Sequence, residues 1–190
     1  PEGSMEYDES FAHEGNASMK MVTGTAFAQT TYLNVVPHTD YRISGWMYVE
    51  KEEDLGKMFI DLWDCRGEVE LYAKKAGEWQ YVSGIWKSYT ANSVRLRCVG
   101  LEGAAGAAWF DDLAIEQLDD ATELENGSFE EDTEFWTSQQ QNLIGVTSNR
   151  AHTGEKSMEL MGRGDLLAIA SSRKIAVEPN SYYEYSGYIY

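Results

Sequence analysis

The stretch WQYVSGIWKSYTANSVRLRCVGLEGAAGAAWFDDLAI, residues 79–115, decides the fold. It contains three runs rich in β-branched and aromatic residues, at 79–86, 93–101 and 107–115, and small or polar residues separate these runs. Such runs are typical of β-strands. The segment EGAAG at 102–106 accepts the backbone angles that reverse a chain. The stretch therefore predicts three successive strands joined by turns.

Two neighbouring carboxylates, Asp111 and Asp112, lie inside the apolar run of the third predicted strand. Acids in a half-buried strand are costly unless a cation or hydrogen bonds satisfy them. Successive side chains of a regular strand point to opposite faces of the sheet, so the pair is not expected to act together on one substrate. We interpret the pair first as a structural feature.

Composition favours a β-rich domain and limits the classes of partner. The chain has 190 residues, of which 43% are hydrophobic and 13% aromatic, and its formal net charge is −17. Such acidity does not provide the positive surface that nucleic acids and anionic membranes require, so neither is an expected partner. No apolar run approaches the ~20 residues of a membrane-spanning helix. The opening PEGS has no feature of a signal peptide and is interpreted as an internal cut.

The chain has two cysteines, Cys65 and Cys98, both in or beside predicted strands. They could form one disulfide or remain as two buried thiols, and the sequence leaves both readings open. Neither belongs to a Cys-x-x-Cys pair, so a zinc site is not expected.

The sequence repeats itself. Residues 12–21 (AHEGNASMKM) match residues 151–160 (AHTGEKSMEL), at an offset of 152 − 13 = 139. Residues 36–48 (VPHTDYRISGWMY) match the segment 177–190, with Gly45 in register with Gly187 at an offset of 187 − 45 = 142. A repeat of this period is too long for a solenoid and is about the size of a complete domain.

The repeat predicts a domain organisation with one near-complete module and part of a second. Residues 5–118 form a module that lacks its first strand, 119–123 form a linker, and 124–190 form the front half of a second copy. Further strands are expected at 18–22, 26–36, 41–49, 58–64 and 69–74. Many short strands without a convincing helix predict an all-β fold, an antiparallel β-sandwich or jelly roll.

Several landmarks occur in a familiar order: NGSFE at 126–130 with a following Trp136, the AHTGEKS block, the Tyr-x-x-Ser-Gly-aromatic strand, GEWQ at 77–80 and WFDDL at 109–113. In this order they resemble carbohydrate-binding modules of the family four, nine and twenty-two type. The resemblance implies a galactose-binding-domain-like β-sandwich. It also implies non-catalytic binding of a polysaccharide or oligosaccharide, within a larger secreted or cell-surface protein, with neighbouring copies of the module as possible partners.

The resemblance further implies a structural calcium ion (Ca²⁺) near the place where the first and last strands of a module meet. Carried over by position, its ligands are Asp111 or Asp112, Glu130, and backbone oxygens of residues 16–20 or 155–157. Calcium accepts such mixed sets of carboxylate and carbonyl oxygens. Exposed or hydrogen-bonded acids at a sheet edge are the alternative.

Sugar binding in such a module depends on aromatic rings, because the apolar face of a sugar stacks on Trp and Tyr while its hydroxyls need polar partners. Alternation along each strand separates the faces. It predicts one exposed platform and places Trp79 in the core. A given Trp of a sandwich is more often buried than ligand-facing, so burial is the alternative for each tryptophan of the platform. The predicted platform consists of Trp46, Tyr48, Trp63, Trp86 and Tyr89, with Arg42, Asp61, Arg95 and Arg97 as polar partners.

The sequence supports a catalytic function less well than a binding function, and the chain is expected not to be an enzyme. No nucleophile elbow, phosphate-binding loop or histidine-rich metal triad occurs in the sequence. His13 and His152 hold equivalent loop positions, which suggests a structural role. The alternative to glycan binding is a structural or adhesive sandwich of a cell-surface or fibre protein, joined by strand exchange between copies.

Overall fold

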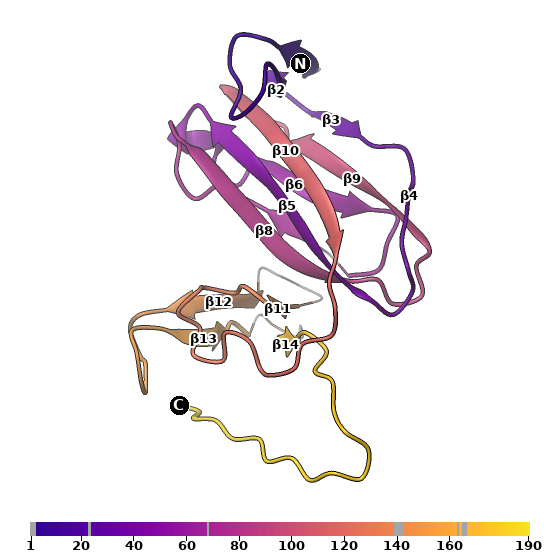
Figure 1. The fold of residues 1–190 in the computed structure, drawn as a ribbon. Helices are drawn as coiled ribbons and strands as arrows, with labels where there is room; N and C mark the ends of the chain where they lie inside the picture. Colours follow the sequence, from indigo (N-terminus) through magenta and orange to yellow (C-terminus); the bar gives the residue numbers. More distant parts are fainter. Residues whose placement is uncertain (1–2, 23, 68, 139–142, 163, 165–166) are drawn as a thin grey trace. The chain divides into compact units, whose positions relative to one another are not determined.

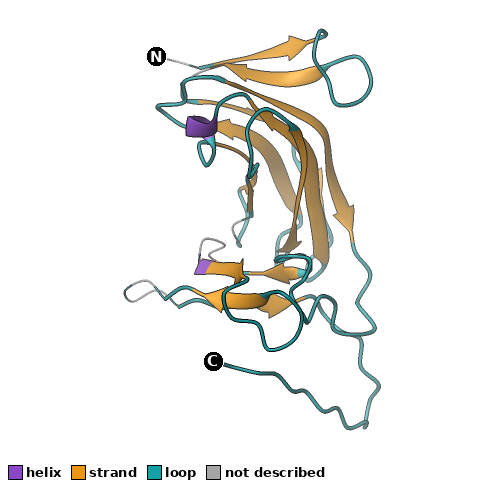
Figure 2. Ribbon diagram, turned by 90° about the vertical axis from the view of Figure 1, so that its left-hand side faces the viewer, coloured by secondary structure: helices purple, strands orange, loops and turns teal. Residues whose placement is uncertain are grey.

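The computed structural model describes residues 3–22, 24–67, 69–138, 143–162, 164 and 167–190. The chain divides into two compact units, Pro1–Leu118 and Asp119–Tyr190. Strands β1 to β10 belong to the first unit and strands β11 to β14 to the second (Figure 1). Strands and loops make up nearly all of the described chain (Figure 2).

The first unit contains two antiparallel sheets. The first sheet has the strand order β1-β2-β10-β5-β8. Its strands are β1 (Ser4–Asp8), β2 (Ser18–Val22), β10 (Ala107–Gln117), β5 (Asp40–Val49) and β8 (Trp79–Lys87). The second sheet has the order β3-β9-β6-β7, and β4 also pairs with β9. Its strands are β3 (Ala26–Gln29), β9 (Ser93–Gly100), β6 (Met58–Trp63), β7 (Glu70–Leu71) and β4 (Leu33–Asn34).

A single hydrophobic core is shared by the two sheets. Strand β5 contributes alternate residues such as Ile43, Met47 and Val49, and β6 contributes Met58 and Ile60; all five are fully buried. Side chains that alternate along a strand give each sheet one apolar inner face. The antiparallel β-sandwich predicted from the sequence is confirmed.

Several predicted strands differ from the observed ones. Residues 4–8 form β1, an acidic edge strand that alternation did not reveal. The predicted strand 26–36 is interrupted and becomes β3 and β4, and the predicted strand 69–74 shortens to β7. The landmark residues 126–130 lie in turns and not in a strand, and Asn126 and Phe129 have positive φ angles of 45° and 62°. Left-handed backbone of this kind is incompatible with a regular strand.

In the described part of the second unit, the strands form two small antiparallel pairs, and the end of the chain is irregular. Strand β11 (Trp136–Thr137) pairs with β14 (Ser171–Ser172), and β12 (Ile144–Thr147) pairs with β13 (Ser157–Leu160). Residues 178–190 form no strand, and their side chains are exposed.

The β12–β13 hairpin repeats the β1–β2 hairpin in the same register. Ser18 pairs with Asp8 and Ser157 pairs with Thr147, so both partners are displaced by the same number, 157 − 18 = 139 and 147 − 8 = 139. The Ser18 hydroxyl donates to the carbonyl of Phe11 at 2.7 Å, and the Ser157 hydroxyl donates to the equivalent carbonyl of Arg150 at 2.5 Å.

The two equivalent histidines also make the same contact. The His13 ring stacks on Trp46 with 3.7 Å between ring centroids, and the His152 ring stacks on Tyr188 at 3.4 Å. Trp46 and Tyr188 are themselves equivalent, since 188 − 46 = 142. The sequence similarity therefore corresponds to the same local structure in both units.

Both cysteines are free thiols. Cys98 points into the core, and burial raises its pKa to about 12; burial, with the nearby Asp61 and Asp64 carboxylates, raises the pKa of Cys65 to about 11. Thiols with such pKa values are protonated at neutral pH and unreactive.

Within the part of the chain that the structure describes, no helix is long and apolar enough to cross a membrane.

Candidate functional site

The outer face of the second sheet combines exposed aromatic rings with charged side chains. Strand β6 directs Asp61 and Trp63 outward, because Met58, Ile60 and Leu62 alternate with them and fill the core. On β9, Arg97 pairs with Asp61 and Arg95 pairs with Trp63. The Trp63 side chain is 49% exposed, and Phe27, which β3 places on the same sheet, is 56% exposed. Four of the predicted platform residues therefore lie together on this face: Asp61, Trp63, Arg95 and Arg97.

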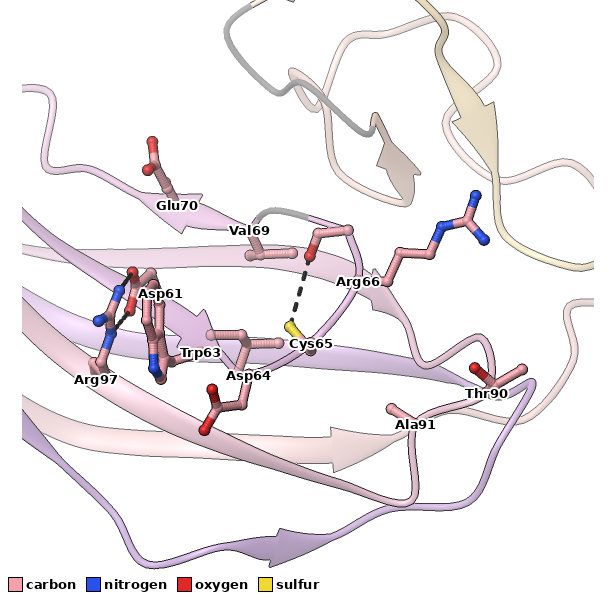
Figure 3. A pocket seen from close by; sticks show the side chains of 12 residues that line it. Asp61, Trp63, Asp64, Cys65, Arg66, Val69, Glu70, Thr90, Ala91 and Arg97 are labelled. Carbon is pink, nitrogen blue, oxygen red and sulfur yellow. Dashed lines mark hydrogen bonds and ion pairs between the residues drawn. The ribbon is translucent and has the colours of Figure 1, made fainter.

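Asp61 and Arg97 form a bidentate ion pair. Arg97 Nε donates to Asp61 Oδ1 at 2.8 Å, and Nη2 donates to Oδ2 (Figure 3). Asp61 is only 6% exposed, so the pair satisfies a carboxylate that burial would otherwise penalise. The hydrogen bonds to Asp61 raise the pKa of Arg97, and they outweigh the opposite effect of burial.

The Arg97 guanidinium also stacks on the neighbouring ring. Its Cζ lies 4.0 Å from the Trp63 ring centroid and 5.8 Å from that of Phe27. A guanidinium over an aromatic face is attracted by the ring quadrupole. Arg97 therefore links the ion pair to the aromatic side chains.

A second group of the same kind lies beside the first. The Arg95 Cζ lies 4.1 Å from the Tyr32 ring centroid, and Arg95 Nη2 donates to the Tyr32 hydroxyl at 2.7 Å. That hydroxyl donates to Asp64 Oδ2 at 2.8 Å, and Arg95 Nη2 is 3.4 Å from the same oxygen. The face thus carries two sets of carboxylate, arginine and aromatic ring.

A cleft of about 600 Å³ opens on this face beside the C-terminal end of β6. Figure 3 shows Asp61, Arg97 and Trp63 together at one side of it, whereas Arg66 points away from them. Its lining residues come from the end of β6, the following loop, β7, the loop before β9, and β9 itself. Across from Asp61, Glu70 on β7 accepts a hydrogen bond of 2.8 Å from the Tyr72 hydroxyl. Burial and this bond raise the pKa of Tyr72.

Two predicted platform residues support the loop at the rim of the cleft. Trp86 is only 1% exposed and lies in the core, where its Nε1 donates to the carbonyl of Arg66 at 2.9 Å. Tyr89 is half-buried, and the Arg66 guanidinium lies 4.9 Å from its ring centroid. The prediction of Trp86 as an exposed residue is wrong, because its register partner on β5 is the inward-facing Tyr41.

The remaining predicted platform residues, Arg42, Trp46 and Tyr48, lie on the outer face of the first sheet. The core lies between this face and the face that carries Trp63. The predicted platform residues therefore lie on two separate surfaces and not on one. The β1–β2 loop covers the aromatic part of the first: Phe11 lies 4.9 Å from Tyr48 and 5.1 Å from Trp109 between ring centroids. Trp79 pairs with Tyr48 on this outer face and not in the core as predicted.

The acid pair is held by the same loop. Asp111 Oδ2 accepts hydrogen bonds from the backbone N–H of His13 at 2.8 Å and of Glu14 at 3.3 Å. Asp112 Oδ2 lies 3.2 Å from His13 Nδ1. A β-bulge between Asp111 and Ala114, with Asp112 at φ = 49°, breaks the alternation. Both carboxylates therefore reach one residue, contrary to the expectation that they point apart.

Glu130 plays a comparable part in the second unit. Its Oε1 accepts hydrogen bonds from the backbone N–H of Glu155 at 3.0 Å and of Lys156 at 3.1 Å. Two backbone N–H donors bond Asp111 Oδ2 and two bond Glu130 Oε1, whereas a calcium ion would require further oxygen ligands there. Among the described residues, no group of three or more His, Cys, Asp or Glu side chains is placed to hold a metal ion. The calcium ion stays a prediction.

Five residues of the second-sheet face were missed in the sequence: Phe27, Tyr32, Asp64, Glu70 and Tyr72. Phe27 and Tyr32 lie in the segment 26–36, whose aromatic residues were a usable signal. Glu70 and Tyr72 alternate in the short run around β7 and could have been assigned to its outer face.

Comparisons with known proteins give structural likenesses only. No protein-family model matches the chain, and no curated protein matches it. Among solved structures, the chain is similar to a Family 16 Carbohydrate Binding Module-2, with 13% identity, a TM-score of 0.45, and coverage of 58% of this chain and 84% of that one.

Two further similar structures come from Xyn10C of Paenibacillus barcinonensis. The CBM22-1 xylan-binding domain has 15% identity and a TM-score of 0.44, with coverage of 63% of this chain and 83% of that one. The CBM22-1-CBM22-2 tandem domain has 17% identity and a TM-score of 0.43, with coverage of 82% of this chain and 53% of that one.

Proposed function

We propose that this chain is a non-catalytic carbohydrate-binding module and that the outer face of its second sheet holds the glycan. The observation that carries the proposal is the grouping of exposed Trp63, Phe27 and Tyr32 with ordered carboxylate and guanidinium groups on one face. A group of exposed apolar side chains with polar groups around it marks a ligand-binding surface more often than single exposed rings do.

The chemistry of the face suits a sugar chain. The C–H faces of sugar rings stack on aromatic rings, and their hydroxyls pair with planar polar groups. The exposed Trp63 ring supplies a stacking surface, and Glu70, which lines the same cleft, supplies carboxylate acceptors. Because Asp61 and Arg97 already hold each other, little side-chain freedom remains to be lost when a glycan binds.

The wider context belongs to the same proposal. The module acts within a larger secreted or cell-surface protein and binds a polysaccharide or oligosaccharide outside the cell. Its formal net charge of −17 disfavours nucleic acids and anionic membranes as partners. A structural calcium ion at Asp111 and Asp112, and neighbouring copies of the module as partners, remain predictions within it.

One observation favours a second candidate, a structural or adhesive module joined by strand exchange. Residues 182–190 match β5 at an offset of 142 and carry exposed side chains, including Tyr185 and Ile189. In the first unit β5 pairs with both β10 and β8. An exposed segment of this pattern can add to a sheet of another copy. A molecular mass that is independent of concentration would contradict this candidate.

The glycan-binding proposal is tested with the full 190-residue chain on a glycan array and then by affinity electrophoresis in gels containing the best polysaccharide. We expect Trp63→Ala to abolish retardation without a large change in thermal stability, because the ring is half exposed. Tyr81→Ala is the matched control, since Tyr81 is 52% exposed on the first sheet and should retain binding. Equal retardation of both variants would contradict the proposed site.

A further inference from the structure

We infer that Asp61 is a positioning residue, which fixes the ring of Trp63 through Arg97 without touching the ligand itself. The effect on glycan binding rests on the function proposed above, whereas the effect on the position of the Trp63 ring does not. The neighbouring set of Asp64, Arg95 and Tyr32 combines the same three kinds of group and provides an internal comparison.

The burial of Asp61 separates its role from that of a ligand-binding group. Asp61 is 6% exposed, and both of its carboxylate oxygens are engaged by Arg97. A glycan hydroxyl would have to displace a charge-assisted hydrogen bond to reach it. Asp61 therefore acts on its surroundings through the guanidinium that it holds.

Arg97 transmits this constraint because it makes two different contacts at once. The edge of its guanidinium forms the fork with Asp61, and its Cζ lies 4.0 Å from the Trp63 ring centroid. The planar guanidinium can form the fork and stack on a ring, whereas the point charge of lysine cannot do both. The ring contact leaves the other face of Trp63 for a ligand, consistent with its half-exposed side chain.

The second set differs in the exposure of its carboxylate and in how that carboxylate is held, which makes it a suitable control. Asp64 is exposed where Asp61 is buried, and it is held through the Tyr32 hydroxyl and a 3.4 Å contact with Arg95. Ion pairs in contact with solvent constrain their partners less than buried ones. The ring of Trp63 should therefore respond to changes at Asp61 and Arg97, and not to a change at Asp64.

The test uses the full chain labelled with 5-fluorotryptophan and observed by ¹⁹F NMR. The Trp63 resonance is assigned as the one lost in Trp63→Phe. We expect Asp61→Asn and Arg97→Lys to shift or broaden this resonance while those of the other tryptophans stay in place. Asp64→Asn should leave the resonance unchanged. Asp61→Glu keeps a carboxylate, so its Trp63 resonance should lie closer to that of the unaltered chain than the resonance of Asp61→Asn does.

Binding is measured on the same variants with hydroxyethyl cellulose and arabinoxylan as soluble probes, together with the best polysaccharide from the array. Loss of the fixed ring should weaken binding by about three- to tenfold, since a side chain must then be ordered on binding. The Asp64→Asn variant should bind as the unaltered chain does.

The outcomes separate the two proposals. If Arg97→Lys or Asp61→Asn leaves the Trp63 resonance unchanged, the positioning role is overturned whatever the affinity. If the resonance moves but the unaltered chain binds no glycan, the positioning role stands and the proposed function fails. If Asp61→Asn does not fold, the Arg97→Lys resonance decides, because that variant keeps the opposite charge beside Asp61.

Discussion

The Asp111 carboxylate accepts a hydrogen bond of 2.8 Å from the backbone N–H of His13, which lies 98 positions earlier in the chain. The same oxygen accepts from Glu14, and the other Asp111 oxygen accepts from the N–H of Asp112 at 2.9 Å. One side chain thus fixes the β1–β2 loop against the bulge of β10. The loop then covers the aromatic side chains on the outer face of the first sheet.

We expect Asp111→Ala to lower the free energy of unfolding by about 1–3 kcal/mol, because it leaves backbone donors without their acceptor. Chemical denaturation followed by tryptophan fluorescence measures the change. Asp112→Ala is the matched control, since Asp112 is exposed and makes one 3.2 Å contact with His13. A larger loss in Asp112→Ala than in Asp111→Ala would contradict this assignment.

The predicted calcium ion can be tested at the same place. Binding would require the Asp111 oxygen to exchange its N–H donors for a cation, with further oxygen ligands from the loop. An ion that binds only the folded chain raises the unfolding temperature with concentration. The prediction is supported if calcium raises the midpoint of the unaltered chain and not that of Asp111→Asn. An unchanged midpoint with calcium and with chelator rules out a stabilising ion.

Trp86→Ala should be far more damaging to stability than Trp63→Ala. Trp86 is fully buried, and its indole N–H bonds the carbonyl of Arg66. Removing a buried aromatic side chain costs about 3–5 kcal/mol, whereas Trp63 is half exposed. Thermal unfolding of the two variants measures the difference. Trp86→Phe keeps most of the ring and loses the hydrogen bond, so its unfolding midpoint should lie between those of the two alanine variants. Similar midpoints for both alanine variants would contradict the assignment of Trp86 to the core and Trp63 to the surface.

Alternation predicted the sandwich and the outward face of β6 correctly because one side of that strand is apolar. Met58, Ile60 and Leu62 define the inside, so Asp61 and Trp63 were assigned correctly to the outside. On β8 both sides are apolar, since Phe11 covers Trp79 while Trp86 fills the core. A strand with two apolar faces has no inside that its own sequence can indicate, and the two tryptophans were exchanged.

The bulge in β10 could not be predicted from the sequence, for a different reason. The period of two holds only while every residue is extended, and Asp112 adopts φ = 49°. No local sequence signal marks this position, because the bulge is fixed by contacts with a loop distant in the chain. The convergence of Asp111 and Asp112 on His13 therefore required the tertiary structure.

Acid should weaken the junction between the 3₁₀ turn Glu52–Asp54 and the loop before β10. Asp54 is fully buried, and its carboxylate accepts hydrogen bonds from the N–H of Ala105 at 2.9 Å and of Gly106 at 2.7 Å, with Lys57 Nζ at 3.5 Å. Burial alone would raise the pKa of Asp54, but these donors together lower it below its ordinary value of 3.8.

A carboxyl group whose pKa is lower in the folded state stabilises the fold at pH values above its unfolded pKa, and the contribution is lost as the pH falls through the folded pKa. The contribution of Asp54 should therefore be constant at neutral pH, begin to fall below about pH 4, and disappear only once the pH is below the lowered folded pKa. Asp54→Asn should be less stable than the unaltered chain at pH 7, and the difference should shrink at pH 2–3. Denaturation curves across this range, with the exposed Glu52→Gln as control, test the assignment; a difference that does not vary with pH would show that the charge of Asp54 does not hold the junction.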